Sequence, residues 1–132
     1  MSQHDLSRRR ALAQLSAASL ATLAPWALAQ TPKPITVGII YVGPKDDFGY
    51  NQAQAESAAE LKKMAGVKVI EEENVPETQA VQKSMQGMIS QDGASLLFPT
   101  SFGYFDPHML AVAAKNTGVR FSHCGGMWTK GK

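Results

Sequence analysis

The chain alternates between short apolar runs and longer segments that are apolar on one side only. Residues 35–41 read ITVGIIY, a β-branched and apolar run typical of a strand buried on both faces of a parallel sheet. Residues 77–91 instead carry apolar side chains at helical spacing, namely Val81, Met85, Met88 and Ile89. The same contrast predicts strands at residues 35–41, 67–71, 94–98 and 120–124, and helices at residues 51–65, 77–91 and 109–116.

This order of elements, β-α-β-α-β-α-β, predicts parallel strands joined by right-handed helical crossovers. We therefore expect a doubly wound α/β sheet with three layers, α/β/α. In the common strand orders of this architecture the first and third strands are neighbours, so the loops that follow them line a ligand-binding crevice. Asp106 and Pro107 predict the start of the third helix, with the carboxylate as its cap.

The two loops at this expected crevice carry the same tripeptide. Phe48-Gly49-Tyr50 follows the first strand, and Phe102-Gly103-Tyr104 follows the third. Four aromatic rings suit a flat, π-bearing ligand. The other interpretation is structural, with Phe48 and Phe102 covering the top of the sheet. Polar side chains accompany the rings in both loops: Asp46, Asp47, Asn51, Ser101 and Asp106.

The first 29 residues have the features of an export signal. Ser7-Arg8-Arg9-Arg10-Ala11-Leu12 resembles a twin-arginine signal, an Ala- and Leu-rich stretch follows, and Ala27-Leu28-Ala29 predicts cleavage between Ala29 and Gln30. Cleavage would remove three of the 13 basic and one of the 11 acidic residues, leaving ten of each and no net charge. We therefore expect a periplasmic protein, and its charge gives no support for nucleic-acid binding.

Cysteine and histidine usage limits the remaining chemistry. Cys124 is the only cysteine, so an intramolecular disulfide is excluded, and its distance from the cleavage site argues against a lipid anchor. We expect Cys124 to be a small buried residue. His123 and Cys124 make a poor catalytic dyad, because adjacent residues of a strand point to opposite faces. Asp46, Asp47 and Asp106 lack the His or Glu partners of a metal site, so we predict neither an enzyme nor a cofactor.

Residues 35–128 resemble the basic membrane protein family of periplasmic substrate-binding proteins, which serve ATP-driven importers of purine nucleosides and nucleobases. The segment VGIIYVGPKDDFGYNQAQAE is similar to the family's first ligand loop. The segment ENVPETQAVQKSMQGMISQDGASLLFPTSFGYFDP is similar to its second helix, third strand and second ligand loop. GPxxDFGY and TSFGYxDP resemble the branch that takes adenine or related purines.

The resemblance implies a bound purine base or nucleoside and an ABC permease as partner. It places two groups of residues near the base: Asp47, Phe48, Tyr50 and Asn51 from the first loop, and Ser101, Phe102, Tyr104 and Asp106 from the second. It implies that an aromatic ring, Tyr50 by preference, stacks on the purine while Asp or Asn side chains bind its edge or the ribose. His123 is a further candidate contact.

Family members have two lobes, and the resemblance covers only the N-terminal part of the first. For residues 30–132 we therefore expect part of one lobe without hinge or second lobe, and weakened or absent purine binding. Two alternatives stay open, a flavodoxin-like exported electron carrier and a gene fragment that binds nothing.

Overall fold

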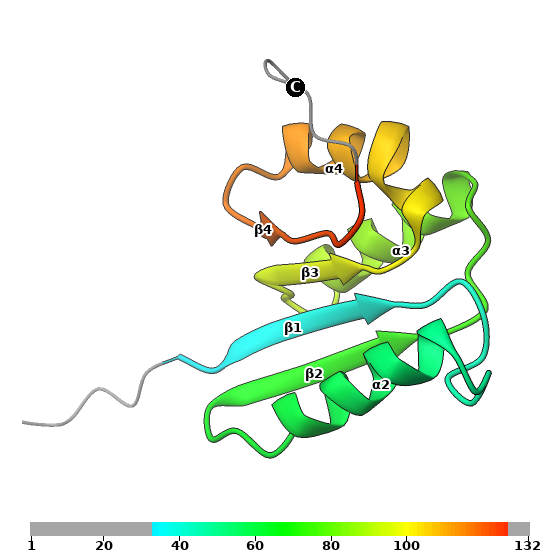
Figure 1. Ribbon diagram of the computed structural model, residues 1–132. Helices are drawn as coiled ribbons and strands as arrows, with labels where there is room; N and C mark the ends of the chain where they lie inside the picture. Colours follow the sequence, from blue (N-terminus) through cyan, green and yellow to red (C-terminus); the bar gives the residue numbers. More distant parts are fainter. Residues whose placement is uncertain (1–32, 127–132) are drawn as a thin grey trace, which may run out of the picture. The chain divides into compact units, whose positions relative to one another are not determined.

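Four parallel strands form the centre of the structure, a computed structural model that describes residues 33–126 (Figure 1). They are β1 (Ile35–Ile40), β2 (Val67–Glu72), β3 (Leu96–Pro99) and β4 (Arg120–Phe121), in the sheet order β2-β1-β3-β4. Each neighbouring pair is parallel, with Val37 aligned to Val69 of β2 and to Leu96 of β3. The predicted adjacency of the first and third strands is confirmed.

Helices cover both faces of this sheet. Helix α2 (Tyr50–Leu61) packs on one face, and α3 (Gln79–Ser90) and α4 (Leu110–Lys115) lie on the other (Figure 1). The predicted three-layer α/β/α architecture is therefore confirmed. No helix within residues 33–126 combines the length and apolar character needed to cross a bilayer.

Alternating residues of β1 divide the apolar core between the two faces. Val37 and Ile39 pack with Ala58 of α2, whereas Ile40 packs with the side of α3 that carries Met85. The helical stripe predicted from the spacing of Val81, Met85 and Met88 is thus the buried side of α3. Burying these side chains removes apolar surface from water, which is the main favourable contribution to folding.

Gly38 allows α3 to approach the sheet closely. A Cβ atom at this position would lie 2.4 Å from Cδ2 of Leu97 and 2.7 Å from Sδ of Met88. A side chain here would force Leu97 and Met88 to shift, which is why glycine suits this position although its neighbours are β-branched.

Several element boundaries differ from the sequence predictions. Helix α2 ends at Leu61 rather than at residue 65, and a turn leads to Gly66, which adopts a φ of +79°. Strand β4 stops at Phe121, so it is shorter than the predicted 120–124. Cys124 consequently lies beyond the strand and is exposed, and the expectation that it is buried was wrong.

The third predicted helix is preceded by two irregular turns. A 3₁₀ turn (Phe102–Tyr104) and a π-helical turn (Phe105–Met109) come before α4, whose N-cap is Met109. Asp106 is therefore not the cap of a regular helix. Its backbone is extended, with φ −119° and ψ 121°, because a residue that precedes proline is disfavoured in the helical region. The predicted signal segment, with Ala29 and Gln30, lies outside the described residues.

Candidate functional site

The carboxyl ends of β1 and β3 are joined by hydrogen bonds and bring the two aromatic loops together. The backbone N–H of Thr100 and its hydroxyl Oγ1 both donate to the carbonyl of Ile40, at 3.1 and 2.8 Å. The hydroxyl of Tyr50, the first residue of α2, donates to the carbonyl of Thr100 at 2.7 Å. The first turn of α2 is therefore tied to the end of β3, across 50 residues of sequence.

Tyr50 and Phe102 form a stacked aromatic pair at this edge. Their ring centroids are 6.1 Å apart and their planes differ by 24°. Phe102 is 66% exposed and Tyr50 is 39% exposed, so both rings keep surface available to a ligand. Partial burial raises the pKa of the Tyr50 hydroxyl, and the nearby Cys124 adds to this rise. The hydroxyl therefore stays protonated and acts as the donor to Thr100.

The carboxylate of Asp47 organises the loop before α2. Its Oδ1 accepts hydrogen bonds from the backbone N–H groups of Gly49 (2.8 Å) and Gln52 (3.0 Å). Its Oδ2 accepts from the backbone N–H and the side-chain Nδ2 of Asn51, at 3.1 and 2.9 Å. Asp47 thus satisfies N–H groups of the first turn of α2, which have no partners within the helix. These bonds, led by that from Gln52, lower the pKa of Asp47 to about 2.

The lowered pKa of Asp47 makes stability depend on pH. Its folded value lies below the ordinary 3.8, so the ionised carboxylate stabilises the folded chain above that pH, and this contribution is lost as the pH falls through about 2. We expect the urea midpoint to drop between pH 5 and 2, and to drop less in Asp47→Asn. The matched control, Asp46→Asn at an exposed neighbour, should keep the wild-type profile. A side-chain carboxyl carbon of Asp47 that titrates near pH 3.8 by NMR would contradict this assignment.

Phe48 lies at the tip of the same loop. Its side chain is 94% exposed and its φ is +55°, a conformation that bulky side chains rarely adopt. Its N–H donates to Oε1 of Gln52 at 3.2 Å. The alternative in which Phe48 and Phe102 cover the top of the sheet was wrong, because both rings are largely in solvent.

Glu77, which the sequence reasoning did not select, holds the second loop. It accepts hydrogen bonds from the Ser101 hydroxyl and from the backbone N–H of Gly103, the latter at 2.9 Å. These bonds, led by that from Ser101, lower the pKa of Glu77. A Cβ atom at Gly103 would lie 2.4 Å from the carboxyl carbon of Glu77. No sequence signal identifies this contact, because the first loop carries the same glycine between two aromatic residues without a comparable approach.

The structure brings most predicted site residues to this edge but separates some of them. Tyr104 is fully buried and its hydroxyl donates to the carbonyl of Val75, so it lies in the core rather than at the surface. Ser101 is buried against Glu77, and Asp106 is exposed in the π-helical turn. Asn51 is 6% exposed, with Nδ2 bonded to Asp47 and Oδ1 buried without a partner among the described residues.

His123 follows β4 and is partly buried against Phe105. The two rings stack at 5.3 Å between centroids, and Nδ1 lies 2.7 Å from the carbonyl of Pro99. A carbonyl can only accept, so Nδ1 carries the proton. Nε2 is buried and has no hydrogen-bond partner among the described residues. His123 and Cys124 both lie beyond the end of β4, so the strand geometry assumed for this pair does not apply to it.

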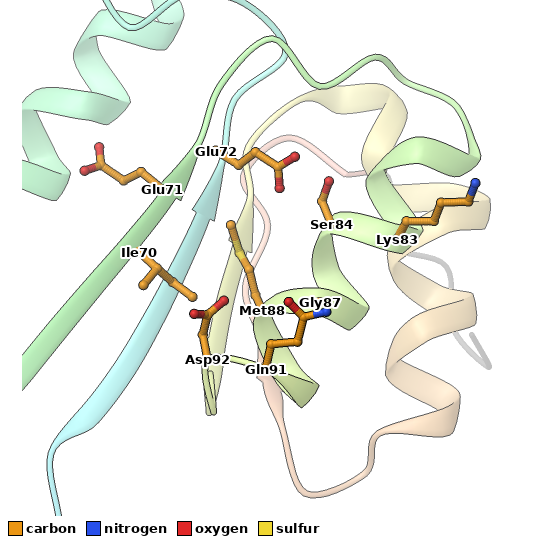
Figure 2. A pocket seen from close by; sticks show the side chains of 9 residues that line it. All are labelled: Ile70, Glu71, Glu72, Lys83, Ser84, Gly87, Met88, Gln91 and Asp92. Atoms are coloured by element: carbon orange, nitrogen blue, oxygen red, sulfur yellow. The ribbon is translucent and has the colours of Figure 1, made fainter.

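The aromatic pair is exposed to solvent. Three hollows among residues 33–126, of about 610, 270 and 250 Å³, have neither Tyr50 nor Phe102 in their walls. Figure 2 shows the hollow between β2 and α3, whose volume is about 610 Å³ and whose walls include Glu72, Ser84 and Met88. It has no aromatic wall, so it does not match the flat ligand expected from the loops.

The chain is similar to known binding proteins in sequence and in fold. No family model matches the chain. The chain is 37% identical over 115 residues to a purine-binding protein of Brucella abortus (strain 2308), covering 83% of this chain and 32% of the relative. Its fold resembles that of an ABC transporter system solute-binding protein from Conexibacter woesei DSM 14684, with a TM-score of 0.53 and 25% identity. That structural match covers 66% of this chain and 28% of the other.

The first of these proteins is named as a purine-binding protein and the second as a solute-binding protein. Neither protein is named as an enzyme. The chain spans about a third of the length of these two proteins.

Proposed function

We propose that the chain contributes one wall of a purine-binding site in an exported solute-binding protein of an ABC importer, of the basic membrane protein family. The observation that carries this proposal is the stacked pair Tyr50 and Phe102 at the carboxyl ends of adjacent parallel strands. Aromatic faces bind bases by stacking, which is worth about 1–3 kcal/mol per base. The name of the Brucella relative supports a purine as the ligand.

The purine would stack on the exposed part of the aromatic pair. Phe102 offers more free ring surface than Tyr50, the ring preferred from the sequence. Asn51 and His123 each keep one acceptor atom that has no partner within residues 33–126, and either could receive an N–H group of the base after local movement. Export and delivery to a membrane permease belong to the same proposal and rest on the similarity to an ABC solute-binding protein.

NMR titration of the full chain with adenine tests this function. Because the aromatic pair is open to solvent on one side, we expect weak binding, with a Kd above roughly 10 μM. Shifts should concentrate on Tyr50, Phe102 and their neighbours, and the pyrimidine cytosine should give smaller shifts as a control. Absence of saturable shifts with adenine, adenosine and hypoxanthine would contradict the proposal. Visible flavin absorbance in the purified protein would instead support an electron carrier.

A further inference from the structure

We propose that Asp47 and Glu77 are positioning residues, which hold the two aromatic loops so that Tyr50 and Phe102 stack, and that the carboxylate of Asp47 does not serve as a ligand contact. The expected effect of these residues on purine binding rests on the proposed function. Their expected effect on the stacking of Tyr50 and Phe102 does not, because it can be measured on the chain without ligand.

Asp47 has little capacity left to bind a ligand. An ionised carboxylate offers about four acceptor positions. Each oxygen of Asp47 accepts two N–H groups, from the backbone of Gly49, Asn51 and Gln52 and from the side chain of Asn51. A donor on the base would have to displace one of these bonds. The bonded backbone groups lie on both sides of Tyr50, so the carboxylate fixes the start of α2 and with it the direction of the Tyr50 side chain.

Glu77, which is distant in sequence from the second loop, fixes the backbone of that loop. Its hydrogen bonds reach Ser101 and Gly103, the two residues that flank Phe102. The short approach to Gly103 means that the carboxyl group lies directly against the backbone of the 3₁₀ turn. A carboxylate packed against the turn in this way supports the backbone that carries Phe102.

One hydrogen bond connects the two supported loops. The Tyr50 hydroxyl donates to the carbonyl of Thr100, which directly precedes Ser101. With both loop backbones held by carboxylates and linked by this bond, the ring of Tyr50 comes to lie 6.1 Å from that of Phe102. The stacking surface is therefore organised before a ligand arrives, which lowers the entropic cost of binding.

The test compares truncating and conservative variants of the full chain. In Asp47→Ala and Glu77→Ala we expect the NMR contacts between the Tyr50 and Phe102 rings to weaken in the absence of ligand. Asp47→Asn and Glu77→Gln keep one acceptor oxygen and should give intermediate contacts. Asp46→Asn and Glu72→Gln, at exposed neighbouring acids, are the matched controls and should leave the contacts unchanged.

Binding of adenine, hypoxanthine and unsubstituted purine separates positioning from direct contact. Because a positioning residue touches no particular edge of the base, the alanine variants should weaken all three by a similar factor, roughly 3- to 10-fold. A loss confined to one purine would overturn the proposal, since that pattern indicates a hydrogen bond to the base edge. Unchanged ring contacts in both alanine variants would overturn it as well.

Two further outcomes are also decisive. If an alanine variant does not fold by circular dichroism, unchanged ring contacts in the corresponding Asn or Gln variant would overturn the proposal. If the wild-type chain binds none of the three purines, the proposed function fails, while the ring contacts still decide the role of the two carboxylates.

Discussion

Replacing Phe102 with alanine is expected to weaken adenine binding about 5- to 150-fold. Stacking of a base on an aromatic ring contributes about 1–3 kcal/mol, and each 1.4 kcal/mol corresponds to a tenfold change in Kd. Phe102 is the residue of the pair with the larger exposed fraction, 66%, so its loss removes the more accessible of the two rings. NMR titration of the variant with adenine, followed to the solubility limit of the base, measures the change.

Two control variants distinguish the loss of an aromatic ring from a disturbance of the surrounding structure. Phe102→Tyr keeps an aromatic face and should bind within about twofold of wild type. Tyr50→Phe keeps the other ring but removes the hydrogen bond to Thr100, so we expect it to fall between Phe102→Tyr and Phe102→Ala. Equal adenine affinity in Phe102→Ala and wild type would show that this ring does not carry binding.

Replacing Met85 with alanine is expected to lower the free energy of unfolding by about 2–5 kcal/mol. Met85 has no exposed surface and lies in the core between α3 and the sheet, so truncation removes buried contacts and leaves a cavity. Single domains have a net stability of only about 5–15 kcal/mol, so this change would be a large part of the total. Urea denaturation followed by circular dichroism measures the shift in midpoint.

Met64→Ala provides the matched control for this substitution. Met64 is 56% exposed in the turn after α2, so the same chemical change there should alter stability by no more than about 0.5 kcal/mol. Similar losses at the two methionines would mean that the core is not packed as described. A changed denaturant slope in Met85→Ala would require a different explanation, because the slope reports the surface exposed on unfolding.

The α/β architecture could be predicted from the spacing of apolar residues, because that spacing reflects which side of each strand or helix is buried. The run at residues 35–41 is apolar because β1 is covered on both faces, and the spacing of Val81, Met85 and Met88 reflects the single buried side of α3. The irregular turns before α4 were missed, since a proline after an aspartate is typical of both a helix start and an extended residue.

The repeated Phe-Gly-Tyr tripeptide is a case in which the local sequence does not predict burial. In the first loop Phe48 is in solvent and Tyr50 is only partly covered, whereas in the second loop Phe102 is exposed and Tyr104 is fully buried. The tripeptides are identical in sequence but different in backbone. Phe48-Gly49-Tyr50 leads into α2 with a positive φ at Phe48, while Phe102-Gly103-Tyr104 forms a 3₁₀ turn over the core.

The sequence by itself determined the order of strands and helices and the adjacency of the two aromatic loops. The tertiary structure alone decided which rings face each other and which carboxylates are already bonded within the protein. The reason is that burial patterns are local in sequence, whereas these hydrogen bonds join distant residues: Tyr50 reaches Thr100, and Glu77 reaches Ser101 and Gly103. Such contacts exist only once the parallel strands have brought their carboxyl ends together.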